Sequence, residues 1–264
     1  MGEVIGIISL KGGVGKTSIV ASLGDAIASF GKKVLLVDGN LSAPNLGLHF
    51  NIVDPEISLH HVLSRVSKPL DAVQGLEKCD ILPASIHQKS AASPLKLKDS
   101  IYPLKKSYDF ILLDSSPSLN DETLGVMLAS DKILVVSTPD HPTLNNTIKA
   151  VKLARQRGTP IIGLILNKVY GKNFEIPISQ IEKTLDLPVM AVIPHETDFL
   201  KSLSEFESLV GKYPKSKAGE EFLRLASVLV GEKYRGPKLR GFVRWLAPKR
   251  QDVNRALYYD GLFS

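Results

Sequence analysis

Apolar residues along this chain gather in short continuous runs, separated by longer segments of mixed polarity. The runs predict β-strands at residues 3–9, 33–38, 79–84, 108–114, 132–137, 160–167 and 187–193. Between them, apolar residues that recur three or four positions apart predict helices at 19–30, 58–65, 95–106, 143–157 and 218–230. Strands without polar alternation are typical of a parallel sheet that is buried on both faces. The pattern therefore predicts one α/β domain over residues 1–231, a doubly wound, mainly parallel sheet with helices on both faces.

The loop between the first strand and the first helix is rich in glycine and also carries lysines and hydroxyl groups. Glycines let backbone N–H groups turn inward around phosphate oxygens, and the following helix points its positive end at the same charge. Lys16 then contacts the outer phosphates, and the Thr17 hydroxyl binds Mg²⁺. Leu10 stands where the first glycine of a phosphate loop belongs, and the alternative interpretation is a flexible glycine turn. The predicted nucleotide-binding residues of this loop are Lys11, Gly12, Gly13, Val14, Gly15, Lys16, Thr17 and Ser18.

Two of the predicted strands end in an aspartate, Asp38 and Asp114. The carboxyl ends of parallel strands meet at one edge of the sheet, so both carboxylates face the ligand crevice. An apolar strand that ends in an acid next to a phosphate loop is the Walker B pattern. Asp38, Asp114 and Thr17 form the predicted Mg²⁺ site, partly through water. The alternative for Asp38 is that it only caps a loop.

The segment 11–17, Lys-Gly-Gly-Val-Gly-Lys-Thr, resembles the deviant Walker A motif of the MinD/ParA family of ATPases. The resemblance covers residues 3–231 and implies a P-loop ATPase with ATP and Mg²⁺ as ligands. It also implies an ATP-sandwich homodimer, in which Lys11 reaches the phosphates of the partner. Where the family has a second aspartate that positions or activates water, this chain has Asn40. An amide can orient water but cannot accept its proton, so we predict slow hydrolysis.

The resemblance implies further roles for three polar or proline residues. In the family, residues at the positions of Asn167 and Pro194 contact the adenine. Asp140 matches in charge an acid that the family uses in the dimer contact, whereas Pro142 and Asn146 differ from the family's serine and aspartate. The segment 115–120 resembles the ParA branch more than the MinD branch. The predicted catalytic residues are Lys11, Lys16, Asp38 and Asn40, and the predicted dimer contacts are Lys11 and Asp140.

Positive charge is concentrated at the C-terminus of the chain. Residues 232–264 hold eight Lys/Arg and three Asp/Glu, a net charge of +5, whereas the whole chain carries +6. Apolar residues in this tail recur with helical spacing among arginines, which predicts a basic amphipathic helix that lies on anionic lipid. The resemblance to the membrane-targeting helix of MinD implies the same role. The predicted membrane-binding residues are Leu239, Arg240, Phe242, Val243, Arg244, Trp245 and Leu246.

Other features of the sequence limit the class of protein. The single cysteine, Cys79, excludes a disulfide within the chain and a four-cysteine metal site, and we predict that it is a buried structural thiol. His60 and His61 are adjacent on a predicted helix, so they point in different directions and are predicted to form a surface pair. The chain shows no signal-peptide pattern and no apolar run that approaches ~18 residues. We therefore expect a cytoplasmic protein that attaches peripherally to the inner face of the cell membrane.

These observations favour a MinD-like ATPase that dimerises on ATP, attaches reversibly to the membrane and positions a cellular assembly with an unknown protein partner or activator. One alternative is a ParA-like ATPase whose basic tail binds DNA without sequence preference. A second alternative is a scaffold that uses ATP as a dimer glue, with little hydrolysis because of Asn40. For the tail, the alternatives are a helix docked on the domain itself, or residues 253–264 acting as a partner-binding peptide or folding over the body.

Overall fold

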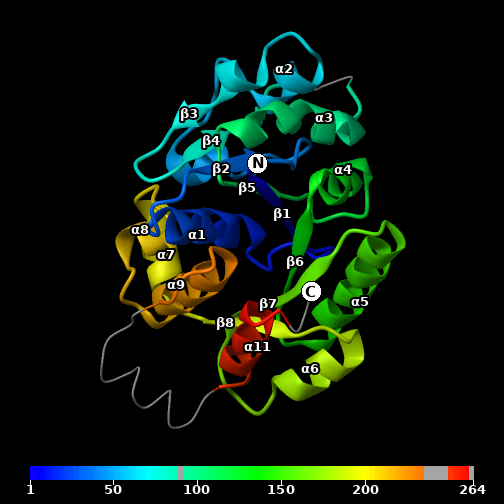
Figure 1. Ribbon diagram of the computed structural model, residues 1–264, viewed down its shortest axis with the longest axis vertical. Coiled ribbons are helices and arrows are strands. Elements are labelled where there is room, and N and C mark those ends of the chain that lie inside the picture. The colour runs from blue at the N-terminus through cyan, green and yellow to red at the C-terminus, as the bar shows by residue number, and fades with distance from the viewer. Residues whose placement is uncertain (89–91, 235–248, 262–264) are drawn as a thin grey trace.

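The computed structural model of the protein describes residues 1–88, 92–234 and 249–261. Within these residues, eight strands form one sheet in the order β3-β4-β2-β5-β1-β6-β7-β8 (Figure 1). The neighbouring strands are parallel except for the short β3–β4 pair. The strands are β1 Glu3–Ile8, β2 Val34–Asp38, β3 Gln74–Gly75, β4 Asp80–Leu82, β5 Phe110–Asp114, β6 Lys132–Ser137, β7 Ile161–Val169 and β8 Val189–Pro194.

Helices cover both faces of this sheet, as Figure 1 shows edge-on. The α-helices are α1 Lys16–Ala28, α2 Leu59–Leu63, α3 Leu97–Ile101, α4 Asp121–Ala129, α5 His141–Gln156, α6 Ile178–Leu185, α7 Asp198–Ser204, α8 Leu209–Lys212, α9 Lys217–Leu229 and α11 Arg250–Tyr259. The 3-10 helices are η1 Gly47–Phe50, η2 Pro69–Ala72, η3 Pro94–Lys96 and η4 Tyr102–Lys106. The predicted doubly wound, mainly parallel α/β fold is therefore confirmed.

The apolar strands feed two separate cores because successive side chains of a strand point to opposite faces. On β1, Val4 and Ile8 join the core beneath α3 to α6, whereas Ile5 and Ile7 join the core beneath α1, α8 and α9. Both faces of the central strands are thus buried, which explains their continuous apolar runs. The same arrangement brings the carboxyl ends of β1, β2 and β5 together at one edge of the sheet.

Several helices were not evident from apolar periodicity. The clearest case is α4, which begins where the Asn120 side chain accepts a hydrogen bond from Thr123 N at 3.1 Å and acids occupy the first turn. These capping signals are readable in the sequence. The predicted helix at 95–106 is interrupted, because its residues divide among η3, α3 and η4 and Pro103 lacks the N–H that would continue it.

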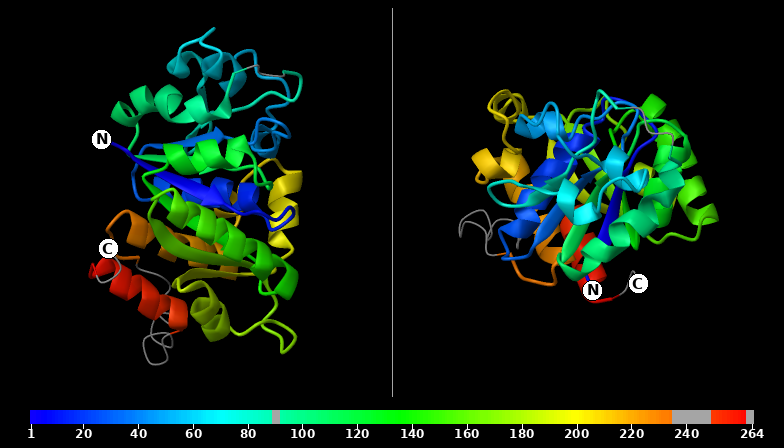
Figure 2. Two further views of the ribbon diagram at one scale, coloured as in Figure 1. Left: turned by 90° about the vertical axis from the view of Figure 1, so that its right-hand side faces the viewer. Right: turned by 90° about the horizontal axis from the view of Figure 1, so that it is seen from above.

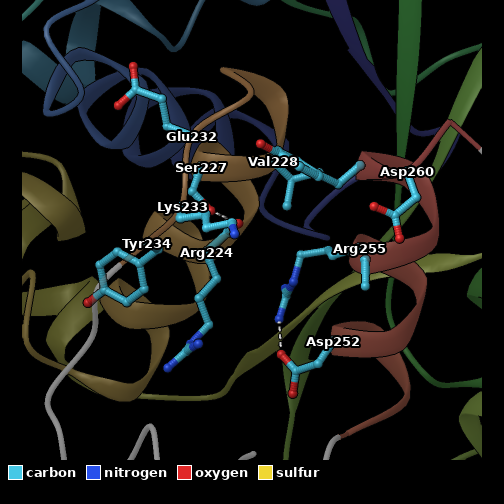
Figure 3. Close-up of a pocket in the computed structure, with 11 residues that line it drawn as sticks. Arg224, Ser227, Val228, Glu232, Lys233, Tyr234, Asp252, Arg255 and Asp260 are labelled. Carbon is cyan, nitrogen blue, oxygen red and sulfur yellow. Dashed lines mark hydrogen bonds and ion pairs between the residues drawn. The ribbon is translucent and has the colours of Figure 1, made fainter.

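The helix α11 packs on the edge strand β8 and beside α9 (Figure 3). Polar side chains hold it there. Asn254 Nδ2 donates to Val189 O at 2.8 Å, and Arg255 Nη1 donates to Met190 O at 2.8 Å and pairs with Glu221 at 2.9 Å. Figure 3 shows Arg255 and Asp252 pointing toward each other beside a cavity of about 460 Å³ between the two helices. Residues 250–259 thus fold over the body, one of the alternatives that the sequence leaves open.

The predicted membrane-binding residues at 239–246 lie outside the described residues. In the part of the chain that the structure describes, no helix has the length and apolarity needed to span a bilayer. Cys79 is buried, as predicted.

Candidate functional site

The phosphate loop turns from β1 into α1 at the carboxyl edge of the sheet. Gly13 and Gly15 adopt left-handed backbone angles, with φ of +76° and +91°, and α1 begins directly after them at Lys16. A Cβ atom at Gly15 would collide with the amide of Asn167, so this position requires glycine. A glycine-rich turn that leads directly into the positive end of a helix is suited to binding an anion.

Two residues at the end of β7 donate hydrogen bonds to this loop. Asn167 Nδ2 donates to Val14 O at 2.7 Å, and Lys168 Nζ donates to Gly13 O at 2.7 Å. Pro194, the other residue for which the resemblance implies an adenine contact, ends β8 opposite Val169 in the strand register. Asn167 and Pro194 thus lie at the carboxyl ends of adjacent strands, and Asn167 is bonded to the loop itself.

Asp38 and Asp114 face each other at the ends of β2 and β5, where they are register partners. Asp114 Oδ2 accepts a hydrogen bond from Thr17 Oγ1 at 2.6 Å. Burial, with the neighbouring charge of Asp114, raises the pKa of Asp38 to about 8, and burial raises the pKa of Asp114 to about 6. The predicted Mg²⁺-binding residues are therefore brought together, in a site that disfavours their negative charge.

This group of side chains fits a hard divalent cation. Mg²⁺ takes oxygen ligands and keeps several waters, and the residues present are two carboxylates and one hydroxyl. Asp114 Oδ1 is buried with no protein hydrogen-bond partner among the described residues, so this oxygen is available to the ion or to one of its waters. Lys16 lies buried beside Asp114, and burial lowers the pKa of Lys16 while the Asp114 charge raises it.

Asn40 lies on the loop that follows β2. Its Nδ2 donates to Ala43 O at 2.5 Å, and its Oδ1 is buried with no protein partner in the described part of the chain. Asp38 holds the same loop by accepting hydrogen bonds from Asn40 N at 3.2 Å, Asn45 N at 3.0 Å and Leu46 N at 2.9 Å. The Asn40 side chain is therefore held on a loop that Asp38 fixes, and its carbonyl oxygen keeps an unused capacity to accept a hydrogen bond.

Sequence reasoning missed Glu122, which ties this loop to the first turn of α4. Its carboxylate accepts hydrogen bonds from Ser42 N at 2.9 Å and Ser42 Oγ at 3.1 Å. The loop is thus bonded to α4, although only the acids in the first turn of α4 signal this in the sequence.

The predicted surface pair at His60 and His61 is wrong for His60, which is buried. His60 Nε2 lies 3.3 Å from Leu41 O, and its Nδ1 accepts a hydrogen bond from Ser85 N at 3.3 Å. The ring fills the space beneath the loop after β2, because that loop folds back over α2.

Lys11 and Asp140 lie at the open rim of the site. Lys11 is exposed, and it lines a cavity of about 470 Å³ together with Asp140 and Lys168. Asp140 caps α5 by accepting hydrogen bonds from Thr143 N at 2.9 Å and from Thr138 Oγ1. Although burial raises the pKa of Asp140, these hydrogen bonds and the charge of Lys11 lower it overall. Ser18, at the other side of the loop, lies 3.1 Å from His49 Nε2.

Comparisons with known proteins agree with this geometry. A family model described as an AAA domain matches residues 2–160. An uncharacterized ATP-binding protein of Methanocaldococcus jannaschii is 32% identical over 237 residues, which are 89% of this chain and 90% of that protein. The septum site-determining protein MinD of Thermotoga maritima is 31% identical over 243 residues, covering 88% and 89%. The structure of the septum site-determining protein MinD complexed with Mg-ADP, from Pyrococcus horikoshii OT3, has a TM-score of 0.82 at 33% identity and covers 92% of this chain and 98% of that chain.

A parallel sheet with a glycine loop after its first strand, and with acids ending the neighbouring strands, defines a P-loop nucleotide hydrolase. The match to the family model and the extent of the similarity identify the family within this class. It belongs to the MinD/ParA family of P-loop ATPases. The predicted family is confirmed, and with it the class of enzyme, an ATPase that uses ATP with Mg²⁺.

Proposed function

We propose that this protein is a MinD-like ATPase that forms an ATP-sandwich homodimer and attaches reversibly to the inner face of the cell membrane to position a cellular assembly. The observation that supports this proposal best is the difference in burial between the two lysines of the phosphate loop. Lys16 is buried beside Asp114, whereas Lys11 is exposed at the rim of the same site. Because the Lys11 side chain is exposed, it is suited to contact a phosphate bound to a second copy of the chain.

In this proposal each chain supplies most of its own site. The N–H groups of the loop and Lys16 hold the phosphates, and Lys11 of the partner adds charge at the γ-phosphate. Thr17, Asp38 and Asp114 would hold Mg²⁺, which when bound neutralises charge between the phosphates. Asn40 orients the attacking water through Oδ1 but does not take its proton.

Replacing Asn40 by aspartate is expected to speed hydrolysis by roughly 10-fold or more, because a carboxylate can act as a general base. Single-turnover hydrolysis measures this directly. Asn45→Asp is the matched control, because Asn45 Nδ2 donates to the same carbonyl, Ala43 O, at 2.7 Å but is exposed. Equal single-turnover rates for the wild type and the Asn40→Asp protein would contradict the role assigned to Asn40.

The membrane part of the proposal rests on the sequence of the tail. The basic amphipathic pattern at 238–246 lies in the chain between Tyr234 and Lys249. A single short helix binds lipid weakly, and two copies in one dimer bind much more tightly. ATP would therefore control attachment by controlling dimerisation.

Co-sedimentation with anionic vesicles tests this proposal. We expect binding with ATP and little binding with ADP, and we expect Phe242→Ser with Trp245→Ser to lower the affinity at least ~10-fold by removing apolar burial. Truncation after Gly236 is a poor test, because it would remove the buried ion pair between Arg255 and Glu221. Val253→Ser, at an exposed apolar position of α11, is the matched control.

A ParA-like function is the second candidate, favoured by the charge of +5 on residues 232–264 and by the sequence at 115–120. Salt-sensitive, ATP-dependent DNA binding without vesicle binding would support it over membrane attachment. ATP-induced dimers that release no phosphate would instead support a scaffold. A protein partner or activator remains part of the proposal in each case.

A further inference from the structure

The loop between β7 and α6 presents two aromatic side chains to solvent. Tyr170 is 54% exposed and Phe174 is 73% exposed. Their ring centroids lie 6.1 Å apart, and the Tyr170 ring lies against the His195 ring, with centroids 4.6 Å apart and the planes tilted by 33°. Exposed aromatic side chains that touch one another form a small apolar surface, which is typical of an interaction site rather than of an isolated surface residue.

The backbone of this loop is fixed by a carboxylate. Glu175 accepts hydrogen bonds from Tyr170 N at 2.8 Å, Gly171 N at 2.7 Å and Lys172 N at 3.1 Å. Ile176 N donates to Pro139 O at 3.0 Å, which ties the loop to the segment that precedes α5. The aromatic rings are thus held in exposed positions by a preorganised loop, which lowers the entropy cost of binding a partner.

The aromatic pair shares one concave surface with the rim of the ATP site. The cavity of about 470 Å³ that holds Lys11 and Asp140 is also lined by Tyr170 and Phe174. In the left view of Figure 2, the phosphate loop (blue) and the loop after β7 (yellow-green) lie at the same edge of the sheet. A partner surface that enters this cavity can therefore contact both Lys11 and the rings.

We propose that Tyr170 and Phe174 form the apolar centre of the contact with a second copy of this chain. This inference rests on the proposed ATP-dependent dimer. A two-fold interface uses the same patch on both copies, so the patch must complement itself. The surface around this cavity carries a cation in Lys11, an anion in Asp140 and the aromatic pair. Buried aromatic side chains are the usual source of affinity at the centre of an interface.

Sedimentation velocity with a non-hydrolysable ATP analogue tests the inference. We expect Phe174→Ser and Tyr170→Ser each to raise the dimer dissociation constant at least ~10-fold, the effect of losing an interface hot spot. Tyr102→Ser is the matched control, because Tyr102 is also 54% exposed but lies on η4, outside this cavity. Binding of the analogue to each variant, measured by calorimetry below the dimerisation concentration, should match the wild type.

The outcomes separate this inference from the function on which it rests. If the wild type dimerises and both variants dimerise equally well, the aromatic contact is refuted and the sandwich dimer survives. If the variants lose affinity for the analogue as single chains, the rings serve the chain's own nucleotide and the inference is overturned. If the wild type stays monomeric with the analogue, the proposed dimer fails first.

Discussion

Replacing Lys11 by alanine is expected to lower ATP hydrolysis roughly 100- to 1,000-fold, the effect of losing a charge that stabilises the transferred phosphoryl group. ATP binding to the single chain should change little. Lys11 is exposed, and its only hydrogen bond to the loop that the structure describes is from its backbone N to Ser9 Oγ at 3.3 Å. Lys16 is buried beside Asp114, and in the proposed function it holds the phosphates of its own chain. We therefore expect the Lys11→Ala substitution to lower ATP hydrolysis while leaving ATP binding to the single chain nearly unchanged.

A mixing experiment tests whether Lys11 acts on the partner chain. The Lys11→Ala protein is combined with an Asp38→Asn protein, which retains Lys11 but lacks one acid of the Mg²⁺ site. In a mixed dimer, the site with Asp38 intact receives Lys11 from its partner, so hydrolysis should recover to about a quarter of the wild-type rate. Lys11→Arg is the control that keeps the charge. A mixture no more active than its components would show that Lys11 acts within its own chain.

Where one local pattern carries the candidate site, its residues can be assigned from the sequence alone. The loop before Lys16 is continuous in sequence, so its glycines and hydroxyl groups could be assigned without knowing the fold. Asp38 and Asp114 end apolar strands, and in a parallel sheet this alone places them at one edge. Their pairing followed from β2 and β5 being neighbours, which the structure shows by their register.

What the sequence did not predict depends on contacts between distant segments. Glu122 binds Ser42, and His60 lies under the loop after β2, but neither residue stands in a recognisable motif. Arg255 is buried although arginine usually predicts exposure, because Glu221 and a carbonyl of β8 lie opposite it. Each partner is fixed only once the sheet order is known, so periodicity could not reveal it.

The ionisation of Asp38 is expected to lower the free energy of unfolding of the nucleotide-free protein by about 2 kcal/mol between about pH 6.5 and about pH 8. Burial, with the charge of Asp114, raises the pKa of Asp38 to about 8, whereas an unfolded aspartate titrates near ~4. Between these values the folded state holds a proton that the unfolded state has lost, so stability falls as pH rises. Burial lowers the pKa values of His49 and His60, so their effect has the opposite sign. It ends in the lower part of this window, just above the pKa of ~6.5 that an unfolded histidine has.

Urea unfolding in EDTA at several pH values measures this slope. Asp38→Asn should flatten it, because an amide has no proton to lose, whereas Asp54→Asn, at an exposed position, should leave it unchanged. An equal slope in the wild type and the Asp38→Asn protein would refute the assignment.

Mg²⁺ with ADP should also flatten the slope, since a cation beside Asp38 and Asp114 favours their ionised forms. The ligand-free site thus lowers the free energy of unfolding, and binding of the metal and the nucleotide removes this effect. Ligand stabilisation should therefore be larger at about pH 8 than at about pH 6.5, by the same ~2 kcal/mol that the ionisation of Asp38 costs the free protein.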